Sequence, residues 1–97
     1  MANEQKGVLL RVMKWSMTDE TTGEIREGTT VTIGMNRTGS TRNPTKGFNI
    51  VKLSTPDTGL FERVDEKLTG KNVVVDCDLQ LLNGGRAKFI PLTVQAA

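Results

Sequence analysis

Apolar and polar residues alternate along much of the chain with a period of two, the repeat of a half-buried β-strand. Residues 7–17 are apolar at both even and odd positions, which favours a long strand that bends and changes the face it buries, or a strand covered on both sides. Residues 30–35 alternate cleanly, and residues 48–54 predict a third, shorter strand. The polar segment between the first two runs predicts a hairpin loop around Gly23, with Gly28 as a candidate bulge.

The last third of the chain has the pattern of a β-hairpin. Asn83, Gly84 and Gly85 separate two alternating runs and suit the positive φ angles of a tight turn. Pro91 has no N–H to donate to a ladder, so the returning strand is expected to have a free edge or a bulge there. The inward side chains are predicted to be Val73, Val75, Cys77, Leu79 and Leu81 in one strand and Ile90, Leu92 and Val94 in the other. Ala87, Phe89 and Thr93 are predicted to point outward.

Residues 56–70 break the period of two and predict a single helix of about three turns. Thr55 or Thr58 is the expected N-cap, and Gly70 is the expected C-terminal stop. The remaining polar positions are charged and suit a solvated side, so the helix should lie with one face on an apolar surface. Its apolar stripe comprises Leu60, Phe61, Val64 and Leu68.

The resulting order is three strands, a helix and two strands. With its long bent first strand, this order resembles the OB-fold, a five-stranded Greek-key barrel that binds oligonucleotides or oligosaccharides on one face. Other small β-barrels and an α+β sandwich are the alternatives. We interpret residues 1–97 as a single OB-like domain. Its parts are strands 1–3 in residues 7–54 with a basic loop at 36–47, a helix at 56–70 and a C-terminal hairpin at 71–95.

The composition argues against several kinds of site. The chain has no histidine, and its single cysteine, Cys77, lies in an apolar alternating run where we expect it to be buried. No metal site, cofactor or disulfide is therefore predicted. Asp76 and Asp78 share a strand phase, but we interpret them as solvated carboxylates, and no nucleophile, base and orienting group occur as a set. No apolar run approaches the roughly 20 residues of a membrane span, so we expect a cytoplasmic, non-catalytic protein with neither a membrane partner nor a small-molecule substrate.

Positive charge is concentrated in one part of the chain, although the net charge is only +2. Residues 28–56 contain four basic residues and no acidic one. A charge distribution of this kind attracts a polyanion. Arg37, Arg42 and Lys46 lie in the loop at 36–47 among Gly, Ser, Thr and Asn. Because so long a loop is uncommon in a compact domain unless it has a function, we interpret it as an arm that contacts phosphates without reading bases.

A single nucleic-acid strand requires cations along a groove and aromatic rings on which bases stack. Trp15, Phe48 and Phe89 are the candidate stacking residues. A core role is the alternative for Trp15, and a subunit interface is the alternative for Phe89. The predicted nucleic-acid-binding residues are Arg11, Lys14, Trp15, Arg37, Arg42, Lys46, Phe48, Lys52, Arg86, Lys88 and Phe89.

The segment LTGKNVVVDCDLQLLNGGRAKFIPLTVQ, residues 68–95, is similar to the closing helix end and hairpin of many OB domains. Together with the element order, it makes the chain resemble the small OB-fold single-stranded DNA-binding proteins of phages and plasmids, including those of filamentous phages. The resemblance implies a protein that coats strands exposed in replication, recombination or transfer, with little sequence preference. The chain departs from the filamentous-phage pattern in having no tyrosine, the residue that those proteins use for stacking.

Two other functions are compatible with the same residues. One is a protein-interaction module that pairs with a replication or anti-defence partner, and the other is an RNA-binding OB domain. We also expect a homodimer or a larger homo-oligomer, because linked binding units hold one strand more tightly than separate ones. The open edge near Pro91 and an outward Phe89 are the candidate subunit contacts.

Overall fold

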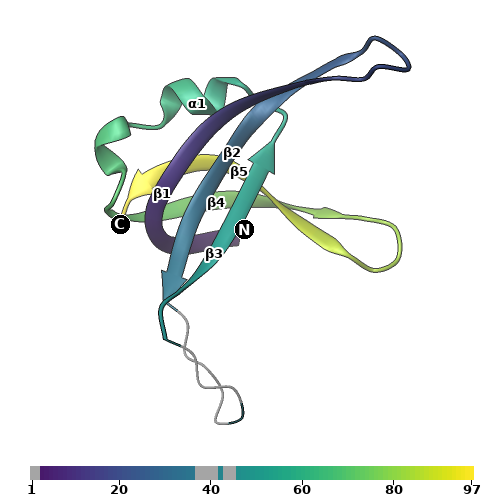
Figure 1. Cartoon of the computed structure of the whole chain (residues 1–97). Helices are drawn as coiled ribbons and strands as arrows, with labels where there is room; N and C mark the ends of the chain where they lie inside the picture. Colours follow the sequence, from purple (N-terminus) through teal and green to yellow (C-terminus); the bar gives the residue numbers. More distant parts are fainter. Residues whose placement is uncertain (1–2, 37–41, 43–45) are drawn as a thin grey trace.

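A computed structural model describes residues 3–36, 42 and 46–97 (Figure 1). Five antiparallel strands form one sheet in the order β3-β2-β1-β4-β5, with one short α-helix between β3 and β4. The prediction of a mainly β chain with this element order is confirmed. The elements are β1 (Asn3–Thr18), β2 (Ile25–Asn36), β3 (Phe48–Thr55), α1 (Gly59–Arg63), the 3-10 turn η1 (Glu66–Leu68), β4 (Asn72–Leu81) and β5 (Ala87–Ala96).

The first strand bends and belongs to both halves of the sheet. Residues 3–8 of β1 pair with β4, whereas residues 8–18 pair with β2. Along β2 the register skips Leu10, so this residue forms a bulge. The bulge shifts the phase of the inward side chains, which include Leu9 before it and Val12 after it. The prediction of a long strand that changes the face it buries is therefore confirmed.

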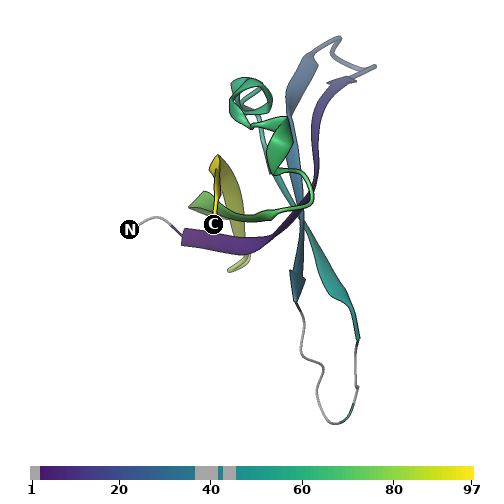
Figure 2. The same ribbon diagram turned by 90° about the vertical axis from the view of Figure 1, so that its left-hand side faces the viewer.

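The bend folds the sheet over on itself. The paired parts of β1, β2 and β3 form one layer, which we call the front leaf (residues 8–18, 25–36 and 48–55). Figure 2 shows β4 and β5 on one side of this leaf, joined to it through the first half of β1. The sheet edges β3 and β5 approach each other, with Cα atoms within 8 Å. Among the described residues no ladder joins these edges, so the sheet is not closed.

The core lies inside this fold, between the front leaf and the β4–β5 hairpin, and α1 covers one end of it. Cys77 is buried there, as predicted. Burial raises the pKa of its thiol, and the negative charge of Asp76 adds to the effect. The buried apolar residues are Leu9, Val31, Ile33, Leu53, Leu60, Val73, Val75, Cys77 and Val94.

The helical region lies where the sequence places it, but the prediction of one helix of about three turns is wrong. α1 has five residues and a separate 3-10 turn of three residues follows it. Between them the backbone of Val64 and Asp65 is extended, and the Asp65 carboxylate accepts a hydrogen bond from the Lys67 N–H (2.9 Å). An aspartate that bonds to a nearby backbone N–H competes with continuation of a helix. In consequence Phe61 is 38% exposed rather than in the core, whereas Leu60 is fully buried.

Asp57 connects the two ends of α1. Its Oδ1 accepts a hydrogen bond from the Gly59 N–H (2.9 Å), and its Oδ2 accepts one from Arg63 Nη2 (2.7 Å). The Arg63 hydrogen bond is the main reason that the pKa of Asp57 lies below its usual range. Thr58 occupies the N-cap position, as one of the two predicted caps, but makes no side-chain capping bond.

We expect the substitution Asp57→Asn to lower stability at pH 7 and to lose this effect as the solution is made acidic. The carboxyl group has a lower pKa in the folded chain than in the unfolded one. Its stabilisation is therefore present above the usual aspartate pKa and is lost as the pH falls through the folded-state value. Urea midpoints of the two proteins should differ modestly at pH 7, because the pair is exposed, and converge in acid. Asp78→Asn, at an exposed carboxylate on β4, is the control, and an equal effect of both substitutions would contradict the assignment.

A second bulge reverses the predicted phase of part of β5. The β4–β5 register skips Leu92, directly beside Pro91, and β5 is an edge strand in the sheet order. Both features expected of a strand containing proline are therefore present. The bulge turns Phe89 towards the core, where it is half-buried, and leaves Leu92 exposed. The predictions of an outward Phe89 and an inward Leu92 are wrong, whereas the open edge near Pro91 is present and its role as a subunit contact stays a prediction.

Candidate nucleic-acid interface

One face of the front leaf is mostly free of other described elements, and only near Trp15 does a residue of β5, Lys88, approach it. Figure 2 shows β4, β5 and α1 on the opposite side of the leaf. Residues paired across neighbouring strands share a side of the sheet, so the register identifies the side chains of this outer face. They are Val8, Arg11, Met13, Trp15 and Met17 in β1, Arg26, Gly28, Thr30, Thr32, Gly34 and Asn36 in β2, and Phe48, Ile50, Lys52 and Ser54 in β3.

Two cations lie in one row across the middle of the outer face. Arg11, Thr32 and Lys52 pair with one another across the three strands. Both cations are exposed, and neither forms a salt bridge with a described residue. Arg11 Nη2 lies 3.3 Å from the Met13 Sδ on the same strand. This row therefore presents two uncompensated positive charges to an anion.

Trp15 lies at one end of the outer face, across from Gly28, its pairing partner in β2. A Cβ atom at Gly28 would lie 2.5 Å from the Trp15 ring and still closer to the Thr55 carbonyl oxygen, so the ring requires glycine there. Gly28 is thus paired rather than bulged, contrary to prediction. Trp15 is half-buried and lines a hollow that Lys88 of β5 also lines. The fold therefore brings together two predicted site residues that are far apart in sequence.

Phe48 lies at the other end of the outer face, and its side chain is open to solvent. It is 60% exposed, and Ile50, its neighbour on the same face, is 54% exposed. The β2 partners of Trp15 and Phe48 are Gly28 and Asn36, which are eight residues apart. At about 3.4 Å per residue, the two aromatic positions are on the order of 27 Å apart along the strand.

The predicted basic arm connects β2 to β3 at the Phe48 end of the outer face. The chain leaves the sheet after Asn36 and returns at Phe48, and these two residues are paired. Arg42 and Lys46 are exposed. Arg37 lies outside the described residues, so its role stays a prediction.

Three of the predicted residues lie away from the outer face. Lys14 points towards α1, where its Nζ lies 3.7 Å from the Glu62 Oε1. Successive residues in a strand point to opposite faces, so Lys14 does not share the face of its neighbour Trp15. Arg86 is in the turn of the β4–β5 hairpin, and Phe89 is half-buried against the core.

The structure adds Met13 and Ile50 to the outer face, and the sequence reading missed both. Their apolar character alone does not separate an exposed position from a buried one. The sequence contained one indication that Ile50 is exposed: Lys52 has the same strand phase as Phe48 and Ile50. A lysine in that phase indicates that the whole face is solvated, since a lysine is almost never fully buried without a partner.

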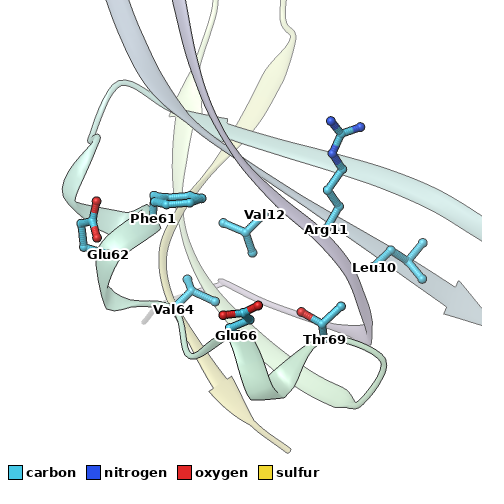
Figure 3. Close-up of a pocket in the computed structure, with 8 residues that line it drawn as sticks. All are labelled: Leu10, Arg11, Val12, Phe61, Glu62, Val64, Glu66 and Thr69. Atoms are coloured by element: carbon cyan, nitrogen blue, oxygen red, sulfur yellow. The ribbon is translucent and has the colours of Figure 1, made fainter.

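A separate hollow of about 550 Å³ lies between β1 and α1. We call it the α1 hollow. Figure 3 shows Phe61, Val12 and Val64 gathered in it, with the Glu66 carboxylate beside Val64, the Glu62 carboxylate beyond Phe61, and Arg11 and Leu10 on the β1 side. The break in the helix creates this arrangement, because Val64 is in the extended segment that follows α1. The lining of the α1 hollow therefore carries two carboxylates and one cation, Arg11, which it shares with the outer face.

Within the described residues, no three His, Cys, Asp or Glu side chains come together as a group that could hold a metal ion. Neither helical segment in the described part of the chain has the length and apolar composition that crossing a bilayer requires.

The outer face combines two aromatic rings with two exposed cations that form no salt bridge with a described residue. Rings of this kind can stack on planar groups, and the cations can pair with phosphates. Comparisons of this chain with protein-family models, with curated proteins and with solved structures found no match.

Proposed function

We propose that this chain is a non-catalytic protein that binds single-stranded DNA on the outer face of the front leaf. One observation carries the proposal: Trp15 and Phe48 lie at the two ends of a mostly uncovered face, and Arg11 and Lys52 lie between them without a salt bridge to any described residue. Bases stack on aromatic rings while cations follow the phosphates, and this combination is typical of proteins that bind single strands.

The topology supports an OB-type barrel as the scaffold. The strand order brings the edges β3 and β5 close together, which a five-stranded Greek-key barrel requires. The helical segment between β3 and β4 also agrees with that fold. In OB domains the surface of strands 2 and 3 binds oligonucleotides, and on this chain that surface carries Phe48 and Lys52.

In the proposed complex, a DNA strand lies along the outer face between the two aromatic rings. A face of roughly 27 Å has room for several nucleotides, and OB domains occupy about 4–16. The basic arm approaches from the Phe48 end, so Arg37, Arg42 and Lys46 add phosphate contacts there. Neither stacking nor phosphate pairing reads base identity. Binding with little sequence preference suits a protein that coats strands exposed in replication, recombination or transfer.

The double substitution Arg11→Ala with Lys52→Ala should reduce the salt dependence of binding. Each lost phosphate contact removes about 0.7 from the slope of log affinity against log salt for a single strand, so two lost contacts should flatten the slope by about 1.4. Trp15 is the only tryptophan of the chain and lies on the proposed face. Its fluorescence should therefore report binding when oligothymidine is titrated at several salt concentrations.

The matched control is Lys14→Ala with Lys67→Ala, which changes the net charge equally. Both lysines belong to the α1 side of the molecule, Lys14 through its pair with Glu62 and Lys67 through η1. The control should keep a slope near that of the wild type. Equal slopes for the two double variants would refute binding on the outer face. Tighter binding of oligouridine would assign the face to RNA, and absence of binding to both strands at low salt would overturn the proposal.

A further inference from the structure

The β4–β5 hairpin extends its inner face beyond the core. Leu79 and Leu81 continue the phase of buried Cys77, as the sequence pattern predicts, but both are exposed, and Leu81 is 78% exposed. Their pairing partners in β5 are Phe89 and Ala87, so the whole of this face is apolar. Figure 1 shows the hairpin projecting past the other strands, which explains why nothing described covers its end.

The end of the hairpin combines exposed leucines with positive charge. Leu82 is exposed and follows Leu81, and its N–H donates a hydrogen bond to the Arg86 carbonyl oxygen across the turn (2.8 Å). Arg86 and Lys88 are exposed. We call residues 79–88 the hairpin tip. A contiguous exposed apolar surface with a charged border is typical of a protein interaction site.

The α1 hollow has the complementary properties. Its apolar part includes Val12, Phe61 and Val64. The charged residues of its lining are Glu62, Glu66 and Arg11, so negative charge is in excess by one. Glu66 forms no salt bridge with a described residue. Glu62 is paired only with an exposed lysine at 3.7 Å, and such surface pairs contribute little. Both carboxylates can therefore accept a cation from outside.

We propose that the hairpin tip of one copy of this chain docks into the α1 hollow of a second copy. Leucine side chains of the tip meet the apolar part of the hollow, and Arg86 approaches Glu62 and Glu66. Docking of two hairpin tips on each other is disfavoured, because it places Arg86 and Lys88 of one copy against the same cations of the other, and like charges across an interface are repulsive.

The two surfaces lie at opposite ends of the molecule. In Figure 1 the hairpin tip projects on the side away from α1, and in Figure 2 α1 is in front while the hairpin is behind. A contact between different surfaces of identical subunits repeats from copy to copy and produces an open chain unless the rotation closes a ring. Neighbouring copies would then support one another, so the assembly adds cooperativity to the proposed coating of a strand.

The test uses two variants, each blocked at one surface, and contains no DNA, so it does not depend on the proposed function. Leu81→Glu blocks the hairpin tip, and Phe61→Lys blocks the hollow and repels Arg86. Sedimentation equilibrium should show a wild-type mass that rises with concentration up to about 500 µM, a range suited to weak association. Each variant alone should stay monomeric. An equal mixture should form a dimer and stop there, since it contains one intact tip and one intact hollow per pair.

Several outcomes would overturn the proposal. They are a wild-type protein that stays monomeric, self-association of Phe61→Lys alone, or a mixture that remains monomeric although both variants keep wild-type circular dichroism. If Leu81→Glu does not fold, Leu81→Gln replaces it. A charge exchange provides a second measurement: Arg86→Glu should weaken association at least about fivefold, and adding Glu66→Arg should restore it. Failure of the second substitution to restore association would exclude the proposed pairing of tip and hollow.

Discussion

Replacing Phe48 with alanine should weaken oligothymidine binding by about five- to 140-fold. Loss of one base-stacking ring costs about 1–3 kcal/mol, and each 1.4 kcal/mol is a tenfold change in affinity. The salt slope should stay nearly constant, because no phosphate contact is lost. Phe48 is mostly exposed, so the fold should tolerate the change. The fluorescence of Trp15, which is unaltered in this variant, provides the measurement.

The control for this substitution is Leu92→Ala, which truncates another exposed apolar side chain on a different strand. It should leave the affinity within about twofold of the wild type, a difference of less than half a kcal/mol. If Phe48→Ala also binds with wild-type affinity, the ring is not a stacking platform. If its salt slope falls together with its affinity, Phe48 acts by positioning the neighbouring basic arm.

The substitution Gly28→Ala should destabilise the fold by about 1–3 kcal/mol, the usual cost of forcing extra volume into a filled space. The new methyl group would meet the Trp15 ring at 2.5 Å and the Thr55 carbonyl even more closely, and neither is the flexible end of a side chain. Trp15 should be displaced, with a change in its fluorescence. Urea denaturation of the wild type and the variant gives the free-energy difference.

Gly34→Ala is the matched control on the same strand. There the nearest atom to the added methyl group is the Leu10 Cδ1 at 3.3 Å, the end of a flexible side chain. Neither Gly28 nor Gly34 has a positive φ, so both substitutions change the entropy of the unfolded chain in the same way. The control should be near neutral. Equal urea midpoints for the two variants would show that the front leaf accommodates a methyl group beside Trp15 without loss of stability. Glycine at position 28 would then not be required by the ring.

The strands could be predicted from the sequence because their hydrophobic period is set by the geometry of the chain itself. Residues 30–35 alternate without interruption, and β2 contains them all. The bend in β1 was also predictable, since apolar residues occur in both phases there. These signals are local, and they require no knowledge of which element covers which face.

The predictions of side-chain orientation are wrong where a single residue changes which face the neighbouring side chains occupy. Leu92 is skipped in the β4–β5 register, and every side chain before it on β5 is then on the other face from the one predicted, Phe89 included. Asp65 has a similar effect on the helix, because its carboxylate caps a new turn and ends the stripe that Phe61 was expected to join. Such positions depend on competition between local hydrogen bonds and tertiary contacts, which the hydrophobic period does not report.

The candidate site was predictable in part for a related reason. Trp15, Phe48, Arg11 and Lys52 were all chosen by chemical type, and the register places them on one face. Their alignment across three strands could not be derived from the sequence, because it depends on the bulge at Leu10. Without that bulge the later part of β1 would present the opposite set of side chains to solvent.

The double membership of β1 also has a consequence for the order in which the chain folds. Its second half pairs with β2 through a short turn, and the Asp19 and Glu24 backbones bond within that turn (2.8 Å). Its first half pairs with β4, so that Asn3 meets Cys77, 74 positions later in the chain. Closing so large a loop costs more entropy, and distant pairings slow folding. During synthesis the first half of β1 must wait until β4 has been made, so the bend is completed long after the second half of β1 can pair with β2.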